Sequence, residues 1–181
     1  MSAATHSPPC MPAQKPGVTC MIMAYNEEAN LEQAVTEVRE QLLRSGRPFE
    51  VLVVDDGSKD RTAAIGDTLA ARWPEVRVIR HGQNRGPGSA IVTGVAEAKM
   101  PLYCFHPADN QVVFADICKA LDLLDKDYDL LVGQRSDRRD YSGLRLLSSY
   151  TSIFLNRVLF GLPDFRDFNF VYLWRTDLVK P

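Results

Sequence analysis

Residues 50–61 read Glu-Val-Leu-Val-Val-Asp-Asp-Gly-Ser-Lys-Asp-Arg, and this pattern indicates the fold class. The first five residues are a short, valine-rich run, which is typical of a strand buried on both faces of a sheet. An acidic pair, a glycine and further polar residues follow, so the chain turns directly after Val54. Residues 62–72 then show a helical pattern. A buried strand that leads through a polar turn into a helix is the repeating unit of an α/β protein.

The same unit occurs on both sides of this stretch. Residues 18–24 form an apolar run that predicts a strand. Residues 28–44 carry apolar side chains at helical spacing, and Asn26 is the predicted cap of that helix. Repeated strand–helix units imply a mostly parallel sheet flanked by helices on both faces. The other predicted strands are 76–80, 102–105, 129–132 and 167–174, and the other predicted helices are 89–98, 114–124 and 144–162.

Composition excludes several classes of protein. The chain has 181 residues, of which 45% are hydrophobic and 24% charged, so we expect one globular domain rather than a disordered or fibrous chain. The net charge of -2 lacks the basic excess of a nucleic-acid-binding domain, so nucleic acid is not an expected partner. No apolar run reaches the roughly 18 residues that a membrane-spanning helix needs.

The first 17 residues differ from the rest, because four prolines stand among small polar residues. We expect residues 1–17 to be a flexible arm and residues 18–181 to be the domain. The arm lacks the basic start and apolar segment of a secretory signal, so we expect a cytoplasmic protein. The chain ends soon after its last motif, and we expect either a C-terminally truncated or a minimal form of the domain.

Polar side chains gather where the predicted strands end. The polar runs are 25–28, 55–58, 106–111 and 133–135, and each follows a strand directly. In open parallel sheets, ligands bind beyond the carboxyl ends of the strands. The sequence therefore predicts one shared polar site at this edge of the sheet.

The acidic pair Asp55-Asp56 has more than one interpretation. Its carboxylates suit hydrogen bonds from a base NH or from ribose hydroxyls, and Gly57 lets the backbone turn closely. In the alternative, Ser58 or Asp60 caps the next helix and the pair is only solvated. Phosphoacceptor domains of the flavodoxin-like class also carry an acidic pair after a strand, so this motif alone does not choose.

Residues 84–90, Asn-Arg-Gly-Pro-Gly-Ser-Ala, open a predicted helix with small side chains. Small residues there let the backbone approach a ligand, and the helix N-terminus suits an anion. The run matches neither the dinucleotide fingerprint nor the phosphate-binding P-loop. We also expect Gly94 and Ala98 to bring this helix close to the sheet.

Together, the motifs AYNEEANL, VVDDGSKDRT, NRGPGSAIVTGVAEA, PADNQ and VGQR resemble the family 2 inverting glycosyltransferases in order and spacing. The closest resemblance is to the polyprenyl-phosphate branch, the dolichol-phosphate mannosyltransferase-like enzymes, and it covers about residues 18–175. It implies a GT-A fold, which is a Rossmann-like α/β sheet. It also implies transfer of a hexose from GDP-mannose or a UDP-sugar to polyprenyl or dolichyl phosphate, by a protein peripheral to the cytoplasmic membrane face.

The resemblance also implies roles for individual residues. The acidic motif after the fourth strand binds the divalent metal and the diphosphate, which assigns the metal to Asp109 and Gln111. Arg135 and a later arginine hold the acceptor phosphate; for the later one we choose Arg145 over Arg138 and Arg139. Asp167 matches an acidic residue of the catalytic segment. The catalytic set is then Asp109, Arg135 and Asp167. The substrate-binding set is Tyr25, Asn26, Glu27, Asp55, Asp56, Asn84, Gly86 and Arg145.

The chain departs from the family pattern at the metal motif. The usual Asp-x-Asp reads Pro107-Ala108-Asp109, so the first carboxylate is missing. In extended chain, residues 107, 109 and 111 face the same way, so Asp109 and Gln111 still reach one ion. Magnesium often takes one or two protein carboxylates and completes its shell with phosphates and water. We therefore expect a weakened Mg²⁺ or Mn²⁺ site. Ala24 and Asn169-Phe170 are further departures from the pattern.

The acceptor determines which groups the reaction needs. A phosphate monoester is mostly dianionic at neutral pH, so it needs cations to hold it, which suits Arg135 and Arg145. A sugar hydroxyl would instead need a general base, for which Asp164 and Asp167 are candidates. A third alternative is a degenerate domain that binds a nucleotide-sugar without catalysis. Residues 144–162 are apolar enough either to contact lipid or to pack in the core.

Overall fold

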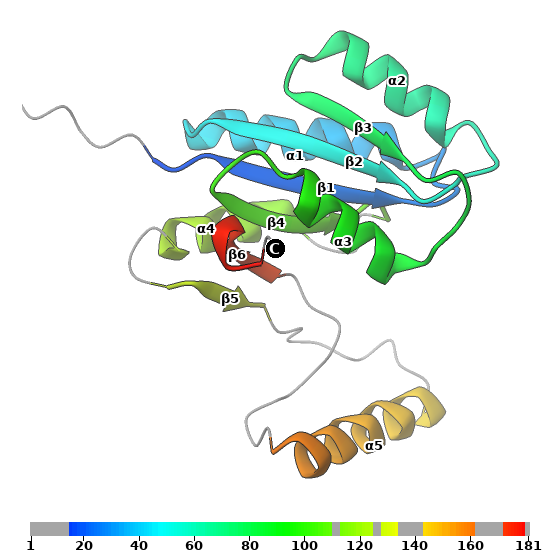
Figure 1. Ribbon diagram of the computed structural model, residues 1–181, viewed down its shortest axis with the longest axis vertical. Coiled ribbons are helices and arrows are strands. Elements are labelled where there is room, and N and C mark those ends of the chain that lie inside the picture. The colour runs from blue at the N-terminus through cyan, green and yellow to red at the C-terminus, as the bar shows by residue number, and fades with distance from the viewer. Residues whose placement is uncertain (1–14, 110–112, 125–127, 134–142, 162–171, 180–181) are drawn as a thin grey trace, which may run out of the picture.

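The computed structural model describes residues 15–109, 113–124, 128–133, 143–161 and 172–179, which form a six-stranded sheet with helices on both faces (Figure 1). The strands are β1 (Val18–Ala24), β2 (Phe49–Asp55), β3 (Val76–Arg80), β4 (Leu102–Pro107), β5 (Leu130–Val132) and β6 (Tyr172–Arg175). The helices are α1 (Leu31–Ser45), α2 (Thr62–Arg72), α3 (Pro87–Glu97), α4 (Phe114–Leu124) and α5 (Gly143–Phe160), with a short 3-10 turn at Thr176–Leu178.

The sheet has the strand order β3-β2-β1-β4-β6-β5. β1 pairs in parallel with both β2 and β4, and β2 pairs in parallel with β3. β6 is antiparallel to both β4 and β5. The predicted mostly parallel α/β sheet is confirmed. Because the connections reverse direction between β1 and β4, the carboxyl ends of these two strands flank a topological switch point, where open sheets bind their ligands.

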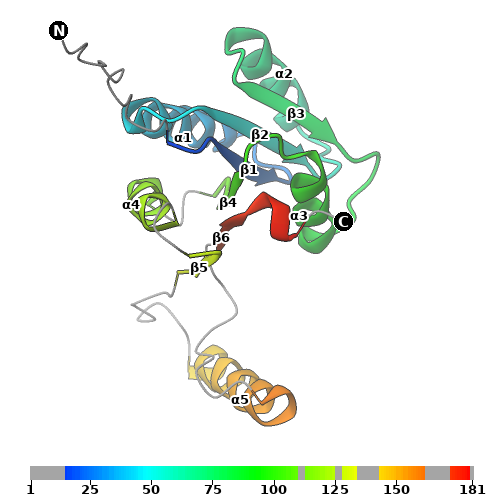
Figure 2. The same ribbon diagram turned by 60° about the vertical axis from the view of Figure 1, so that its left-hand side comes forward.

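The side chains of β1 alternate between the two faces of the sheet. Cys20 and Ile22 belong to a core that contains the buried faces of α1, α2 and α4. Met21 belongs to a second core with Ala90 and Val95 of α3. Figure 2 shows α3 across the sheet from α1. The central strands are buried on both faces, which explains why their sequences are continuous apolar runs.

Close packing of α3 on the sheet depends on glycine, as expected. A Cβ on Gly94 would lie 2.6 Å from the Tyr103 hydroxyl oxygen and 2.7 Å from Met21 Cγ. Ala98 is also buried, at the end of the same helix. The small residues of this helix therefore have a packing role in addition to any role in a site.

The first helix begins three residues later than predicted, and Asn26 does not cap it. α1 starts at Leu31, and its N-cap is Asn30. Asn26 instead adopts a left-handed conformation with φ of 55°. The Asn26 side chain accepts a hydrogen bond from the Lys59 amide, 33 residues away. The prediction failed because that bond is made by a loop that only the fold brings near.

Most other bounds agree with the predictions. Helices 62–72 and 114–124 and strand 76–80 are confirmed without change. α3 begins at Pro87, two residues before its predicted start, because proline suits the first position of a helix. The predicted strand 167–174 is observed as β6, and its first five residues lie outside the described part of the chain.

The end of the predicted N-terminal arm contacts the domain. Lys15 pairs with Asp122 across 2.8 Å, and the buried Arg47 donates to the carbonyl oxygen of Pro16. The carbonyl of Gly17 accepts a hydrogen bond from the β4 amide of Leu102. The ordered contacts thus include residues 15–17. Residues 1–14 lie outside the described residues, and the flexible arm stays a prediction for them.

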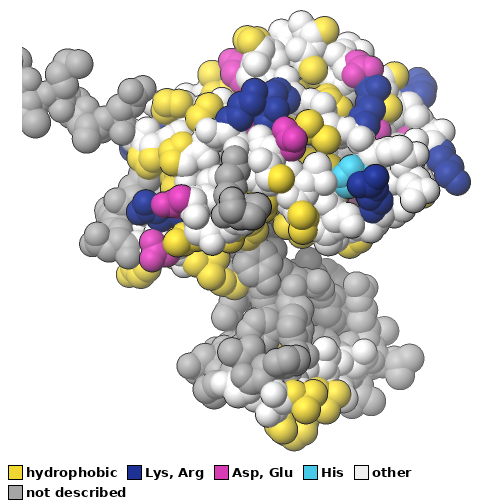
Figure 3. Space-filling view, viewed as in Figure 1, with side chains coloured by type: hydrophobic (Ala, Val, Ile, Leu, Met, Phe, Trp, Pro, Cys, Tyr) yellow, Lys and Arg dark blue, Asp and Glu magenta, His cyan; other side chains and the backbone are white. Residues whose placement is uncertain are grey.

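α5 presents apolar side chains to solvent. Among them, Phe154 is 64% exposed and Leu159 is 71% exposed, whereas the neighbouring Ile153 is buried and is not one of them. Figure 3 shows apolar side chains at one end of this helix. None of the helices that the structure describes combines the length and the apolar character needed to cross a bilayer.

Candidate functional site

The loops after β1, β2 and β3 meet at the carboxyl edge of the sheet, beside the turn that follows β4. The first two loops interlock through backbone amides and side-chain oxygens. The Asn26 amide donates to Ser58 Oγ at 2.9 Å, and the Lys59 amide donates to Asn26 Oδ1 at 2.8 Å. The Glu27 amide donates to Thr62 Oγ1 at 2.8 Å. Two of the predicted motifs therefore hold each other in place.

Charged side chains extend the same contact. The Glu28 amide donates to Asp60 Oδ2, and Glu28 Oε2 accepts from the Arg61 amide. Asp60 Oδ1 also accepts from the amide of Thr62, the first residue of α2. The alternative that Asp60 caps α2 is thus partly right, although the N-cap position itself is Arg61. Ser58 Oγ bonds across to the first loop instead.

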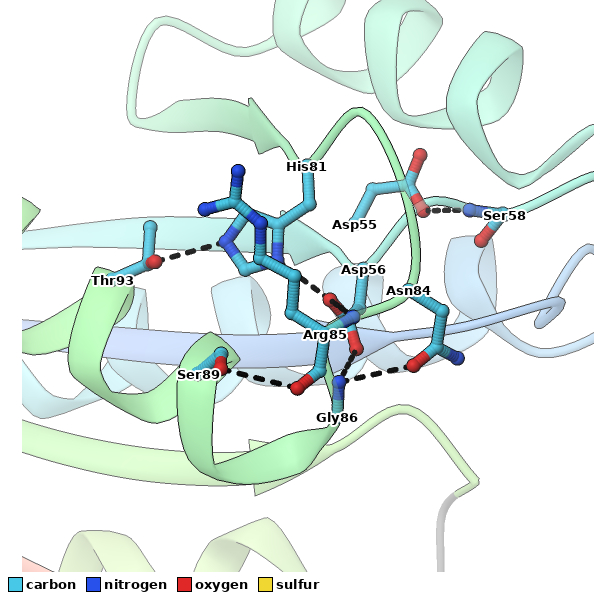
Figure 4. A network of polar contacts seen from close by, with 9 residues as sticks. All are labelled: Asp55, Asp56, Ser58, His81, Asn84, Arg85, Gly86, Ser89 and Thr93. Atoms are coloured by element: carbon cyan, nitrogen blue, oxygen red, sulfur yellow. Dashed lines mark hydrogen bonds and ion pairs between the residues drawn. The ribbon is translucent and has the colours of Figure 1, made fainter.

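Asp55 and Asp56 are buried, each with 3% of its surface exposed. The alternative that the pair is only solvated is therefore wrong. Asp55 Oδ1 accepts from the Ser58 amide at 2.9 Å and closes the turn after β2 (Figure 4). Gly57 has a φ of 76°, and a Cβ there would lie 2.5 Å from the backbone carbon of Gln83. Only glycine lets the turn after β2 approach the loop after β3 so closely.

Asp56 binds the loop that precedes α3. Asp56 Oδ1 lies 2.6 Å from His81 Nδ1 and accepts from the Arg85 amide at 3.0 Å. Asp56 Oδ2 accepts from the Gly86 amide at 2.8 Å. Burial raises the pKa of this carboxyl, but hydrogen bonds from Arg85, His81 and Gly86 outweigh burial and hold the pKa below its usual value. The carboxylate is therefore ionised and already engaged by the protein.

The loop before α3 is closed by short contacts. Gly86 has a φ of 85° and is the N-cap of α3. Its amide also lies 3.0 Å from Asn84 Oδ1, so the candidate residues Asn84 and Gly86 bond to each other. Asn84 and Arg85 are exposed at this point. The loop thus offers an amide, a guanidinium and a helix N-terminus to a ligand, which together suit an anionic or polar group.

Two of the predicted residues lie on the first loop with exposed surface. Tyr25 is 39% exposed, at the end of β1. Glu27 is partly buried, and its Oε2 accepts from Asn30 Nδ2 at 2.8 Å. Their side chains are on the same edge as the Asp55–Asp56 turn, so the structure brings these predicted residues together.

Asp109 lies in the turn after β4 and is exposed. The backbone of this turn is tied to β1, because the Ala108 amide donates to the carbonyl oxygen of Met23. Within the described residues, no group of three or more His, Cys, Asp or Glu side chains is placed to hold a metal ion. The described residues fit an ion that is held by one carboxylate and completed by a substrate, and they do not fit an ion enclosed by protein.

His106 lies in β4, three residues before Asp109, and is a core residue. It is fully buried, and its ring meets the Phe114 ring edge-on with centroids 5.4 Å apart. Burial lowers its pKa to about 4, while the nearby Asp109 acts in the opposite direction. Among the described residues, neither ring nitrogen has a hydrogen-bond partner.

The remaining predicted residues cannot be placed. Gln111, Arg135 and Asp167 lie outside the described residues, as does Asp164. Arg145 lies on α5, but its side chain is outside the described part of the structure. The predicted acceptor side of the site therefore stays a prediction.

His81 is the site residue that the sequence analysis missed. It follows β3 directly, its Nδ1 faces Asp56, and its Nε2 lies 2.9 Å from Thr93 Oγ1 (Figure 4). The signal was available, because a histidine at a strand end fits the same pattern as the polar runs. The sequence analysis missed His81 because it is a single residue that belongs to none of the motifs.

Comparison with known proteins identifies the relatives of the chain. The sequence model described as Glycosyl transferase family 2 matches residues 19–173. A dolichol-phosphate mannosyltransferase of Pyrococcus furiosus is 31% identical over 154 residues, which are 83% of this chain and 42% of that protein. An undecaprenyl-phosphate 4-deoxy-4-formamido-L-arabinose transferase of Pseudomonas aeruginosa is 30% identical over 141 residues, which are 77% of this chain and 42% of that protein. The chain thus spans about two fifths of the length of the curated relatives that it matches.

Solved structures share the fold. A mannosyltransferase from Pyrobaculum calidifontis in complex with GDP-Man and Mn²⁺ has a TM-score of 0.63 at 20% identity, over 92% of this chain and 46% of that one. Glucosyl-3-phosphoglycerate synthase from Mycobacterium tuberculosis in complex with UDP has a TM-score of 0.69 at 17% identity, over 91% of this chain and 58% of that one. The predicted fold class is confirmed by these neighbours.

Proposed function

Because the chain belongs to glycosyl transferase family 2, we propose that it is the donor-binding and catalytic domain of an inverting hexosyltransferase. In this proposal the donor is a nucleotide-sugar and the acceptor is a polyprenyl phosphate. The observation that carries the proposal is the meeting of the three interlocked loops with the Asp109 turn at the carboxyl edge of the sheet.

We divide the residues of the donor site into two groups by their exposure to solvent. Asp55 and Asp56 are buried and hold loops, so we assign them mainly to shaping the donor site. Tyr25, Asn84 and Arg85 are exposed at the same edge, and we assign them to nucleotide contact. Two proteins of the same fold were solved in complex with GDP-Man and with UDP, so GDP-mannose and a UDP-sugar are the donors that we propose to test.

Asp109, with Gln111, would hold Mg²⁺ or Mn²⁺ together with the donor diphosphate. An ion there would neutralise part of the charge that develops on the leaving nucleoside diphosphate. Because Pro107 occupies the first position of the motif, we expect this binding to be weaker than is usual in the family.

The acceptor half rests on chemistry and on the names of the relatives. A polyprenyl phosphate is mostly dianionic at neutral pH, so it attacks the anomeric carbon without a base. Arg135 and Arg145 would hold its phosphate, and Asp167 would complete the catalytic set. Relatives named for dolichol phosphate and undecaprenyl phosphate support this acceptor class. The exposed apolar side chains of α5 support contact with a lipid surface, at the cytoplasmic face of the membrane.

A second candidate function is favoured by Pro107. A domain that lacks the first carboxylate of the metal motif is suited to bind a nucleotide-sugar without turning it over. The variant Pro107→Asp separates the two functions. If the site is a weakened version of the usual one, restoring the carboxylate tightens metal-dependent nucleotide binding and raises turnover together. If the domain only binds, the variant changes affinity and turnover stays absent.

The proposed function is tested first by calorimetric titration with GDP and UDP, with and without Mg²⁺ or Mn²⁺. Metal-dependent binding of one nucleotide is the expected result, and its identity indicates the donor. Radiolabelled transfer to a polyprenyl phosphate, compared with transfer to a sugar hydroxyl acceptor, then tests the reaction. Absence of binding by either nucleotide with any metal contradicts the proposal.

A further inference from the structure

His81 lies at the centre of a buried network that joins two strand ends to a helix (Figure 4). Its side chain and that of Asp56 are each 4% exposed. His81 Nδ1 lies 2.6 Å from Asp56 Oδ1, at the end of β2. His81 Nε2 lies 2.9 Å from Thr93 Oγ1, in the middle of α3. Among the described residues, both ring nitrogens of His81 therefore have partners, in contrast to those of the buried His106.

The donor and acceptor roles in this network follow from its two ends. The ionised Asp56 carboxylate can only accept, so His81 Nδ1 carries the proton and donates to it. In the neutral ring, Nε2 then accepts from the Thr93 hydroxyl. The ring thus links the carboxylate to α3 in one fixed orientation.

The Asp56 carboxylate transmits this orientation to the loop before α3. Its two oxygens accept from the backbone amides of Arg85 and Gly86. The same loop exposes the Asn84 and Arg85 side chains at the edge where the nucleotide is expected. A rotation of the carboxylate would leave the Arg85 amide without a side-chain acceptor among the described residues, whereas the Gly86 amide would keep its bond to Asn84 Oδ1.

We propose that His81 is a positioning residue for the donor site: it fixes the Asp56 carboxylate and thereby the loop of residues 84–86 that contacts the nucleotide-sugar. The inference rests on the proposed function, since that function supplies the ligand of the loop. His81 itself contacts no substrate in this account. Its effect is to order the loop before the donor arrives, so that binding does not bear the cost of ordering it.

Two matched variants separate the two contacts of the ring. An asparagine side chain places its amide nitrogen near the position of Nδ1, so His81→Asn keeps a donor for Asp56 and loses Thr93. A glutamine places its amide near Nε2, so His81→Gln keeps a partner for Thr93 and loses Asp56. Both substitutions put one amide into the same buried space, but His81→Gln loses a hydrogen bond to a charged group, so we expect it to lose more folding stability. Binding is therefore compared at a temperature where both variants are fully folded.

The test compares nucleoside diphosphate binding and amide exchange in these variants. We expect His81→Gln to weaken the affinity for GDP or UDP about tenfold or more, and His81→Asn to weaken it less than about threefold. Hydrogen exchange at the Arg85 and Gly86 amides in the free protein should accelerate in His81→Gln and stay near wild type in His81→Asn. Thr19→Val is the control, because it removes a buried hydroxyl that bonds Glu50 at the opposite end of β1.

The outcomes distinguish this inference from the proposed function. If the wild-type protein binds neither nucleotide, the proposed function fails, and the exchange rates alone decide whether His81 orders the loop. If the wild type binds and His81→Gln retains its affinity and exchange protection, the inference is overturned. It is also overturned if the affinities of both His81 variants and Thr19→Val fall in proportion to their loss of stability.

Discussion

At the scale of single residues, Asp56 shows how the protein's own donors satisfy a buried carboxylate. Three donors of the protein surround its carboxylate, one from the His81 ring and two from backbone amides. Hydrogen bonds to a charged group contribute more than neutral ones, so this carboxylate stabilises the fold as well as the site. Its substitution should therefore affect folding and binding together.

We predict that Asp56→Asn destabilises the protein at neutral pH by about 1–3 kcal/mol, because the amide cannot accept from all three donors. The folded-state pKa of Asp56 lies below its ordinary value of 3.8. The ionised Asp56 therefore contributes to the free energy of unfolding above pH 3.8. This contribution is lost as the pH falls through the lower, folded-state pKa. Urea unfolding between pH 7 and pH 2.5 should show a difference between wild type and variant that shrinks toward the acid end. A difference that is constant over this range contradicts the prediction.

Gly57 and Gly46 allow a matched test of close approach. Both have positive φ, of 76° and 69° respectively, so alanine at either position bears a cost of about 1–2 kcal/mol. A Cβ on Gly57 would also lie 2.5 Å from backbone of the facing loop, whereas a Cβ on Gly46 would meet nothing within 4 Å. We predict that Gly57→Ala costs about 1–3 kcal/mol more than Gly46→Ala in chemical denaturation. Equal losses would mean that the loops move apart freely.

At the scale of elements, the sequence predicted the helices and strands well and their junctions poorly. The apolar runs identified the strands because parallel strands are buried on both faces. The start of α1 and the role of Asn26 depend on contacts between residues more than 30 positions apart, such as Asn26 with Lys59. Local pattern cannot contain such contacts. His81 was missed for another reason, because a lone histidine at a strand end is a weak signal until the fold shows its bonds to Asp56 and Thr93.

The contact of α3 with the sheet gives a prediction at this scale. Gly94 faces the Tyr103 hydroxyl and Met21, and the exposed Gly88 on the same helix has nothing within 4 Å of a built Cβ. We predict that Gly94→Ala lowers the free energy of unfolding by about 1–3 kcal/mol because α3 must shift from the sheet. Gly88→Ala should be neutral or stabilising by up to about 1 kcal/mol, since alanine favours helix. Thermal unfolding monitored by circular dichroism measures both, and an equal effect of the two variants would contradict the packing argument.

At the scale of the whole molecule, the two edges of the sheet have different tasks. At the amino-terminal edge, the buried Glu50 accepts from Thr19, Arg77 and the Lys99 amide, and these contacts join strands and a helix end. At the carboxyl edge, comparable bonds hold loops whose other side chains stay exposed. The carboxyl edge also contains an ion pair between loops, Glu28 with Arg61 across 3.2 Å, so charged side chains hold the chain at both edges.

The apolar face of α5 gives the prediction for the molecule as a whole. If it contacts lipid, the purified protein should float with vesicles that contain anionic phospholipid at low salt. We predict that replacing Phe154 and Leu159 with serine lowers the vesicle-bound fraction about tenfold, because each exposed apolar side chain contributes when it enters the bilayer surface. Val92→Ser is the control, since Val92 is 69% exposed on α3. Flotation of the α5 variant like wild type would mean that another part of the protein binds the vesicles, and no flotation of the wild type would contradict the lipid contact.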